Sequence, residues 1–274
     1  MTGARRTVVF DLDNTLILED ASTLSAIRAA AERCDVDGES LATVVVDTAE
    51  RLWKNSPVVD WVETFGISWG EALWGSFGGD DPGLREMRAF VGGFRLAVWR
   101  GALERLGRAD AAVTERLAAA YVGARRARET IDPDAEPALR DLRRDHRLAL
   151  VSNGAGDVQR EKLSRTPFAP YFEAVVISTE VGVGKPDPRI FTRALAALDA
   201  VPGDATMVGD SLQRDVAGAR AAGMRTIWLD RTLGDEKDAR PDVARPDVRI
   251  ERLSDLRAAL DALERRPASP RAKS

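Results

Sequence analysis

The sequence predicts an α/β protein whose doubly wound parallel sheet is interrupted by an inserted all-helical domain. Two observations carry this fold class. The apolar run Val8–Phe10 is typical of a buried strand, but residues 19–130 follow it with helical periodicity. From Ile131 onward, apolar runs alternate with amphipathic helices, which indicates a parallel sheet. The first strand therefore belongs with the C-terminal half of the chain.

This organisation predicts two domains and a tail. Residues 1–18 and 131–266 are expected to form the α/β core, in a Rossmann-like arrangement, and residues 19–130 a helical cap domain. Residues 267–274 combine proline, alanine, serine and basic side chains, a composition that favours disorder.

The cap sequence predicts four longer helices with a broken segment between the second and the third. Pro57 and several glycines divide that segment into short helices, and Gly92–Gly93 predicts a weak point in the third long helix. Val44–Val46 is the one stretch of the cap that resembles a strand. The longer helices are expected over Ala21–Arg33, Glu39–Leu52, Leu84–Leu106 and Ala111–Arg128.

In the core, four further strands alternate with helices. The strands are expected over Arg147–Val151, Ala174–Ile177, Ala205–Val208 and Arg225–Leu229. The helices are expected over Glu136–Arg144, Val158–Ser164, Pro188–Leu198, Val216–Ala222 and Ser254–Glu264. The polar stretch Gly234–Pro246 is expected to be a surface loop.

Composition excludes several classes of protein. A formal net charge of −4 gives no basic footprint for nucleic acid. No apolar run approaches the roughly 20 residues of a membrane helix, and the N-terminus lacks the apolar core of a signal peptide. A single cysteine, Cys34, excludes an intrachain disulfide framework and cysteine-rich zinc sites. The single histidine, His146, lies in a charged stretch and is expected at the surface. These properties favour a cytoplasmic protein.

Polar side chains follow four of the predicted strands at their carboxyl ends. Because those ends meet at one edge of a parallel sheet, where open α/β sheets keep their sites, we expect these side chains to lie together. In chain order they are Asp11 and Asp13, then Ser152 and Asn153, then Lys185, and finally Asp210 and Asp215.

The residue types fit chemistry on a phosphate group. Asp11, Asp210 and Asp215 can surround a magnesium ion, because Mg²⁺ prefers oxygen ligands. Ser152 and Lys185 can donate hydrogen bonds to a phosphate whose remaining charge the metal balances.

Two different carboxylates would carry out the reaction itself. With the phosphate bound and its charge balanced, one carboxylate is free to attack phosphorus, since aspartate forms covalent aspartyl phosphates in enzymes. Asp13 would protonate the leaving oxygen and later take a proton from the attacking water.

Four motifs in this order resemble those of the haloacid dehalogenase-like (HAD) hydrolases, in particular their phosphatases with an α-helical cap inserted after the first strand. The cap matches that family in position and helical character only. The motifs are Phe-Asp-Leu-Asp-Asn-Thr-Leu from Phe10, Val-Ser-Asn-Gly from Val151, Gly-Val-Gly-Lys-Pro-Asp-Pro from Gly182, and Val-Gly-Asp-Ser-Leu from Val208 with Asp215 beyond it.

The resemblance implies distinct roles for the residues of the first motif. It makes Asp11 the nucleophile and a metal ligand. It makes Asp13 the general acid and base, with its backbone carbonyl also on the metal. Thr15 would fix the loop. The dehalogenating branch of the family lacks the second aspartate, so Asp13 favours phosphoryl transfer over dehalogenation.

The resemblance also implies the binding residues. Ser152 and Asn153 would bind the phosphoryl group, and Lys185 would hold phosphate and nucleophile together. Asp210 would ligate magnesium, and Asp215 would act through a metal-bound water.

Structural alternatives exist for several of these residues. Asn153 could cap the following helix, and Asp215 could favour the N-terminus of its own helix. Thr15 could be a plain turn residue, and Lys185 a solvated charge in a loop.

The cap says less about function. Leu18–Asp20 should lie at the mouth of the site, and Arg95 and Arg100 could meet a second anionic group or lie at the surface. Most of the cap tryptophans are expected in its core, with one or two facing the active site as the alternative. They are Trp53, Trp61, Trp69, Trp74 and Trp99.

The sequence therefore predicts a magnesium-dependent phosphatase for a small phosphorylated metabolite, such as a sugar phosphate or a nucleotide, acting through an aspartyl phosphate. A phosphomutase with the same intermediate is the first alternative, and a phosphoaspartate signalling or binding module the second. We expect a monomer or homodimer, with no nucleic-acid or membrane partner.

Overall fold

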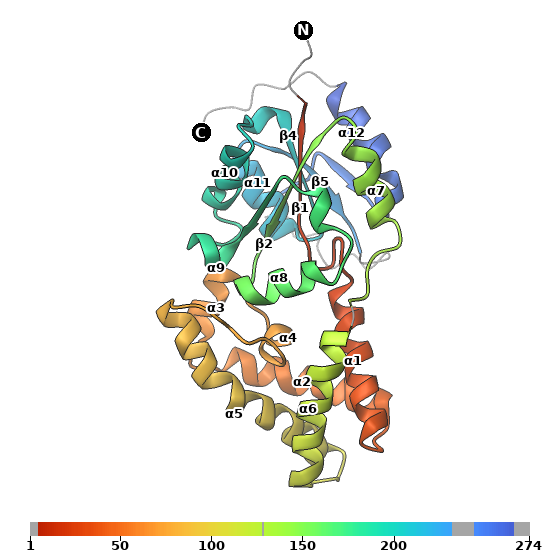
Figure 1. Ribbon diagram of the computed structural model, residues 1–274, viewed down its shortest axis with the longest axis vertical. Coiled ribbons are helices and arrows are strands. Elements are labelled where there is room, and N and C mark those ends of the chain that lie inside the picture. The colour runs from red at the N-terminus through yellow and green to blue at the C-terminus, as the bar shows by residue number, and fades with distance from the viewer. Residues whose placement is uncertain (1–4, 128, 232–243, 266–274) are drawn as a thin grey trace.

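A computed structural model describes residues 5–127, 129–231 and 244–265 (Figure 1). Most of the loop predicted over Gly234–Pro246, and the tail predicted over 267–274, lie outside the described residues. The described chain forms an α/β layer at one end and a helical layer at the other (Figure 1). Both connections between the layers lie beyond the carboxyl end of the first strand, where Ile17 and Ile131 are paired.

The core is a six-stranded parallel sheet in the order β3-β2-β1-β4-β5-β6. The predicted fold class is confirmed, and all five predicted strands are present. Sequence patterning missed β6, because its three residues are too short to show as an apolar run. The strands are β1 (Thr7–Phe10), β2 (Arg147–Ser152), β3 (Ala174–Ile177), β4 (Ala205–Gly209), β5 (Arg225–Leu229) and β6 (Val248–Ile250).

Strand β1 lies in the middle of the sheet, paired in parallel with β2 and β4. Its side chains are buried on both faces: Val8 and Phe10 pack in one hydrophobic cluster and Val9 in another. A strand covered on both faces needs apolar residues at every position, which explains the unbroken run that marks it in the sequence. The backbone N–H of Asp11 continues the pairing to the carbonyl of Val208 at 3.0 Å.

Helices cover both faces of the sheet (Figure 1). Residues of α7 (Ala135–Leu142) and α12 (Leu256–Glu264) pack with Val8 and Phe10, and residues of α10 (Pro188–Ala197) pack with Val9. The remaining helical segments of the core are α8 (Gly156–Ser164), α9 (Ser178–Val181), α11 (Ala217–Ala221), a π-helical turn Leu212–Val216, and 3₁₀ turns at Ala169–Tyr171, Pro202–Asp204 and Leu253–Asp255.

The insert is entirely helical among its described residues. Val44–Val46 lies within α2 and not in a strand, and α5 runs unbroken through Gly92–Gly93, where a side chain would meet open space. The helices are α1 (Glu19–Arg33), α2 (Gly38–Lys54), α3 (Val59–Phe65), α4 (Trp69–Ala72), α5 (Pro82–Arg105) and α6 (Ala111–Ala127).

The tryptophans of the insert lie in or against its hydrophobic cluster. Trp53, Trp74 and Trp99 are buried in its hydrophobic cluster, while Trp61 and Trp69 are only partly buried and pack against it. Their apolar rings therefore supply much of the core of a small helical layer.

The chain leaves and re-enters the sheet through two adjacent segments. Ile17 forms an antiparallel bridge with Ile131, the N–H of Leu18 donates to the carbonyl of Thr130 at 2.8 Å, and that of Asp132 to the carbonyl of Leu16 at 3.0 Å. The domain boundaries at residues 18/19 and 130/131 stay a prediction.

The prediction that His146 lies at the surface is wrong. Its side chain is buried, with Nδ1 2.8 Å from Asp145 and Nε2 3.0 Å from Glu264 of α12. The charged neighbours suggested exposure, but His146 directly precedes β2, and there α12 covers the imidazole. Among the described residues, no helix combines the length and the hydrophobicity that a membrane span requires.

Candidate active site

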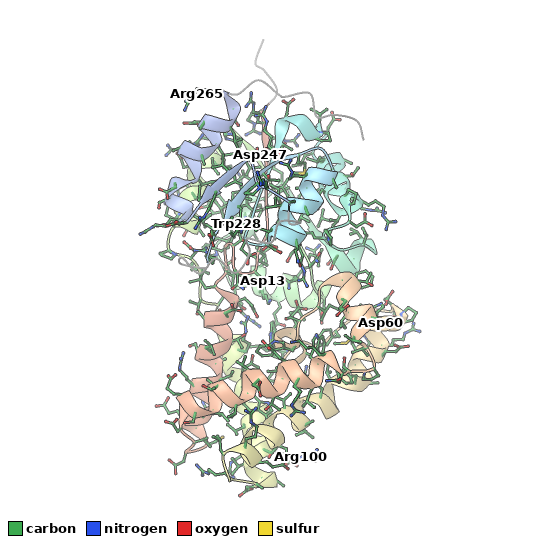
Figure 2. All side chains as sticks on the ribbon, turned by 180° about the vertical axis from the view of Figure 1, so that it is seen from behind. Asp13, Asp60, Arg100, Trp228, Asp247 and Arg265 are labelled. Carbon is green, nitrogen blue, oxygen red and sulfur yellow. The ribbon has the colours of Figure 1, made fainter. Side chains whose placement is uncertain are left out.

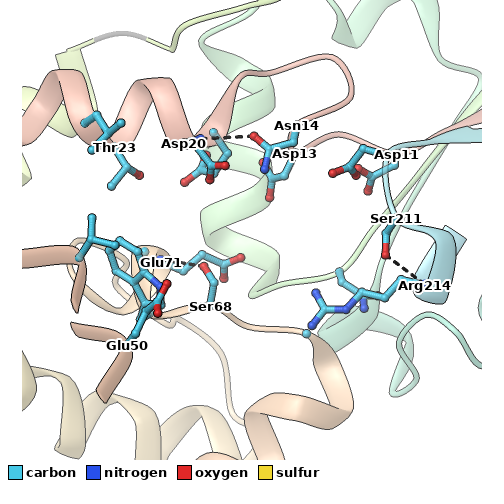
Figure 3. Close-up of a pocket in the computed structure, with 18 of the residues that line it drawn as sticks. Asp11, Asp13, Asn14, Asp20, Thr23, Glu50, Ser68, Glu71, Ser211 and Arg214 are labelled. Atoms are coloured by element: carbon cyan, nitrogen blue, oxygen red, sulfur yellow. Dashed lines mark hydrogen bonds between the residues drawn. The ribbon is translucent and has the colours of Figure 1, made fainter. Parts of the chain in front are cut away.

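The carboxyl edge of the sheet faces a cavity of about 800 Å³ between the core and α1, α2 and α4 (Figure 3). Asp13 lies at this junction of the two layers (Figure 2). Six of the seven predicted site residues line the cavity: Asp11, Asp13, Asn153, Lys185, Asp210 and Asp215.

Asp11 is buried and held at both carboxylate oxygens. Thr15 Oγ1 donates to Oδ2 at 3.1 Å, and Lys185 Nζ donates to Oδ1. Burial raises the pKa of the Asp11 carboxyl, against the lowering effect of Lys185. The loop after β1 thus presents one carboxylate in a fixed orientation to the cavity.

Three carboxylates of this edge converge. Asp11, Asp210 and Asp215 each offer an oxygen, and these atoms lie within 4.8 Å of one another. Lys185 reaches Asp215 Oδ1 at 2.7 Å as well as Asp11, and the backbone N–H of Ser211 donates to Asp215 Oδ2 at 3.0 Å.

The third member of this cluster lacks a cation of its own. Asp210 forms no ion pair within the described part of the chain, and burial, together with Asp11 and Asp215, raises the pKa of its carboxyl well above the ordinary value. An all-oxygen donor set with one uncompensated carboxylate fits a hard divalent cation such as Mg²⁺.

Asp13 faces helix α8 of the core. Lys162 Nζ contacts its two carboxylate oxygens at 3.0 and 2.9 Å, and Gln159 Nε2 donates to Oδ2 at 3.2 Å. Burial raises the pKa of the Asp13 carboxyl, and the charge of Lys162 opposes that rise.

The two polar residues at the carboxyl end of β2 differ in position. Ser152 Oγ donates to Gln159 Oε1 at 3.0 Å, and Ser152 is absent from the lining of the cavity. Asn153 binds the backbone of Lys185 twice, through Nδ2 to the carbonyl at 2.9 Å and through Oδ1 to the N–H at 2.7 Å. Asn153 therefore fixes the lysine loop and does not cap α8, whose N-cap residue is Ala155.

The cap contributes the other wall of the cavity. Asp20, Thr23 and Glu50 come from α1 and α2, while Ser68 and Glu71 come from the segment around α4 (Figure 3). Arg214 of the core faces them across the cavity (Figure 3).

The two cap arginines considered for a second anion lie elsewhere. Arg95 Nε donates to the carbonyl of Ala72 at 2.8 Å. Arg100 lies at the far end of the insert, where its side chain is exposed (Figure 2). Neither lines the cavity, so the surface alternative holds for Arg100 and a structural role for Arg95.

Three comparisons place the chain among known proteins. The sequence profile of the haloacid dehalogenase-like hydrolases matches residues 5–223. A phosphoserine phosphatase of Thermus thermophilus is 41% identical over 88% of this chain and 96% of its own length. The chain belongs to the haloacid dehalogenase-like hydrolases.

Further relatives agree with this assignment. A glyceraldehyde 3-phosphate phosphatase of Methanopyrus kandleri is 40% identical over 45% of this chain and 54% of its own length. The crystal structure of a 2-haloacid dehalogenase from Pseudomonas syringae superimposes with a TM-score of 0.56 at 25% identity, covering 94% of this chain and 99% of that one. The predicted family and the predicted class of phosphatase enzyme are thereby confirmed.

Sequence reasoning missed three residues of this HAD-like hydrolase that lie next to Asp13. Gln159 and Lys162 lie three positions apart on α8, so they share one face of the helix. Glu71 comes from α4 of the cap. All three are buried, yet in the sequence each reads as an ordinary polar residue of an amphipathic helix.

Proposed function

We propose that this hydrolase is a magnesium-dependent phosphatase that cleaves a small phosphomonoester through an aspartyl phosphate on Asp11. The observation that carries the proposal is the setting of Asp11. Both of its carboxylate oxygens are held, by Thr15 and Lys185. Asp11 also belongs to a cluster of three carboxylates in which Asp210 has no ion-pair partner among the described residues.

In the first step, a carboxylate oxygen of Asp11 attacks phosphorus and the bond from phosphorus to the leaving oxygen breaks. Asp13 donates its proton to that oxygen, so that the leaving group departs as an alcohol. Lys185, 2.7 Å from Asp215, offers positive charge beside both the nucleophile and the phosphoryl group.

In the second step, Asp13, now a carboxylate, takes a proton from a water molecule as the water oxygen attacks the phosphorus of the aspartyl phosphate. The bond between phosphorus and the Asp11 oxygen breaks, which releases inorganic phosphate and restores the Asp11 carboxylate.

Asp11, Asp210 and Asp215 would hold the metal, together with the backbone carbonyl of Asp13. When bound, Mg²⁺ supplies positive charge that offsets the charge of the phosphoryl oxygens and of the clustered carboxylates.

Phosphoserine is the first substrate to test, because the relative from Thermus thermophilus carries the name of a phosphoserine phosphatase. With the phosphate group of phosphoserine at Asp11, the carboxylate of the substrate would meet Arg214. The ammonium group of the substrate would meet Asp20 or Glu50 across the cavity. The cap would thus select the leaving group while the core performs the reaction.

The test is phosphate release from phosphoserine, sugar phosphates and nucleoside monophosphates with Mg²⁺, using Asp11→Asn as control. We expect release with the wild type only. Conversion of one phosphate isomer into another without phosphate release would instead identify a phosphomutase. A cytoplasmic location and a monomeric or homodimeric state stay predictions.

A further inference from the structure

Helix α8 belongs to the sheet layer but packs into the cap (Figure 1). Ala155, just before it, and Val158 are part of the hydrophobic cluster of the cap. The backbone N–H of Gly78 donates to Asp157 Oδ2 at 2.8 Å. A side chain at Gly75 would come within 2.6 Å of Val158, so the two layers are in close contact here.

Gln159 of α8 joins three groups of the site through one side-chain amide. Its Nε2 donates to Glu71 Oε1 at 2.9 Å and to Asp13 Oδ2 at 3.2 Å, and its Oε1 accepts from Ser152 Oγ at 3.0 Å. An amide has two N–H donors on one atom, and here oxygens of two carboxyl groups accept from both. In this orientation the amide oxygen is left to accept from the Ser152 hydroxyl, so all three groups bear on the position of one side chain.

Glu71 is the cap residue that reaches this amide. Its carboxyl group is buried, with Oε1 on Gln159 and Oε2 accepting from the backbone N–H of Ala155 at 3.1 Å. Both donors belong to the core. If the cap moves away, Glu71 leaves with it, and both donors lose their partner, which is costly for groups that stay buried.

We propose that Gln159 is a positioning residue that couples the seating of the cap, through Glu71, to the orientation of Asp13 and Ser152. The inference rests on the proposed role of Asp13 as general acid and base. With Glu71 withdrawn, the amide can turn away from Asp13, whose carboxylate then keeps Lys162 as its one side-chain donor among the described residues. A lysine ammonium group is a compact charge on a flexible stem, so it defines the orientation of a carboxylate less sharply than lysine and amide together.

The coupling has a direct chemical consequence. Asp13 is oriented to give its proton only while the cap encloses the leaving group. Phosphoryl transfer to Asp11 is then favoured when the cavity is closed to bulk water.

The leaving group of the substrate provides the test. A serine alkoxide needs a proton as it departs, whereas p-nitrophenolate is a stable anion that does not. We therefore compare kcat/KM, which reports the steps up to phosphoryl transfer, for phosphoserine and for p-nitrophenyl phosphate. In Gln159→Leu, the kcat/KM for phosphoserine divided by that for p-nitrophenyl phosphate should fall by at least about 10-fold.

Glu71→Ala should lower the same ratio, and the double variant should lower it no further than the stronger single variant, because Glu71 acts through Gln159. Asp157→Asn is the matched control: it weakens another contact between core and cap, that with Gly78, and leaves Gln159 in place. Its ratio should equal that of the wild type. An equal loss for both substrates in Gln159→Leu would overturn the inference.

A second measurement needs no turnover. The side-chain amide signal of Gln159 in ¹⁵N–¹H spectra should shift in both Glu71→Ala and Asp13→Asn, since both remove or alter a group that accepts from it. An unchanged signal in either variant overturns the inference. A wild type that releases phosphate from neither compound overturns the proposed function instead, and the amide signal then still decides the role of Gln159.

Discussion

The two walls of the cavity hold their charges differently. On the core side, the side chains of Lys185 and Asp215 form an ion pair at 2.7 Å and are 3% and 1% exposed. On the cap side, those of Arg28 and Glu39 pair at 2.6 Å but are 46% and 75% exposed. A buried pair fixes both partners and is costly to break, whereas an exposed pair adds little to stability. The Lys185–Asp215 pair of the core wall is therefore fixed, while the Arg28–Glu39 pair of the cap wall is free to vary with the leaving group. Deeper in the cap wall, Glu19 and Glu71 are buried as well.

The largest effect is expected from Asp11→Asn on the core wall. An amide at this position does not attack phosphorus, so phosphate release should fall by more than about 1,000-fold. The measurement is phosphate release from phosphoserine, with circular dichroism to check the fold. Wild-type activity in this variant would refute the proposed nucleophile.

Lys185→Met should have the largest effect on stability. It leaves the buried carboxylates of Asp11 and Asp215 without their shared cation, which should lower the free energy of unfolding by about 3 kcal/mol. Urea unfolding at neutral pH without metal measures this. Added Mg²⁺ should restore part of the loss, because it supplies positive charge to the same carboxylates. A stability equal to that of the wild type would show that the core wall is no more tightly held than the cap wall.

Metal binding should stabilise the wild type through Asp210. At a Mg²⁺ concentration about 100 times the Kd, the expected gain is about 2.7 kcal/mol, seen as a rise in Tm. Asp210→Asn should lose most of this rise. Asp20→Asn, a carboxylate on the cap wall outside the cluster, should keep it. Equal responses of the two variants would argue against the proposed site.

The pH dependence of stability should reveal Glu71. Burial raises the pKa of its carboxyl to about 8. Between the ordinary value of 4.5 and about 8, the folded state holds a proton that the unfolded state has released, so stability falls as pH rises. Glu71→Gln removes this titration.

We therefore expect the Tm of Glu71→Gln to decline less between pH 5 and 8, by about 2–8 °C, than that of the wild type. Thermal unfolding across this range measures the difference, with the exposed Glu50→Gln on the same cavity as control. Parallel curves for wild type and Glu71→Gln would mean that the Glu71 carboxyl is already ionised at pH 5.

The smallest effect is expected from Arg28→Met on the cap wall. Because its pair with Glu39 is exposed, the Tm should stay within about 1 °C of the wild type. The value of kcat for p-nitrophenyl phosphate should not change. The value of KM can change for a substrate whose leaving group is charged, because Arg28 lines the cap side of the cavity. A loss as large as that of Lys185→Met would remove the distinction between the two walls.

Most of the core wall could be predicted from the sequence. A central strand buried on both faces needs an unbroken apolar run, and the polar residues that end such strands meet at one edge, so Asp11, Asp210 and Asp215 could be grouped without coordinates. The placement of Ser152 was less predictable. Ser152 ends the expected strand, but its hydroxyl donates to Gln159 and does not line the cavity.

Residues whose burial the sequence did not predict share one physical reason. His146 and Lys162 are polar residues in charged, helix-like stretches, which usually means exposure, yet each is covered by an element distant in the sequence. Strand β6 was missed for a related reason, since its pairing with β5 gives three residues a place in the sheet that their own pattern does not predict.

The sequence by itself determined the parallel sheet, the inserted helices and the family motifs at the strand ends, because burial periodicity and strand-end position are local properties of the chain. Only the tertiary structure decided what surrounds Asp13. The contacts of Gln159 with Glu71 and Asp13 join residues 88 and 146 positions apart. They exist because α8 packs between the sheet and the cap, and no local pattern records that packing.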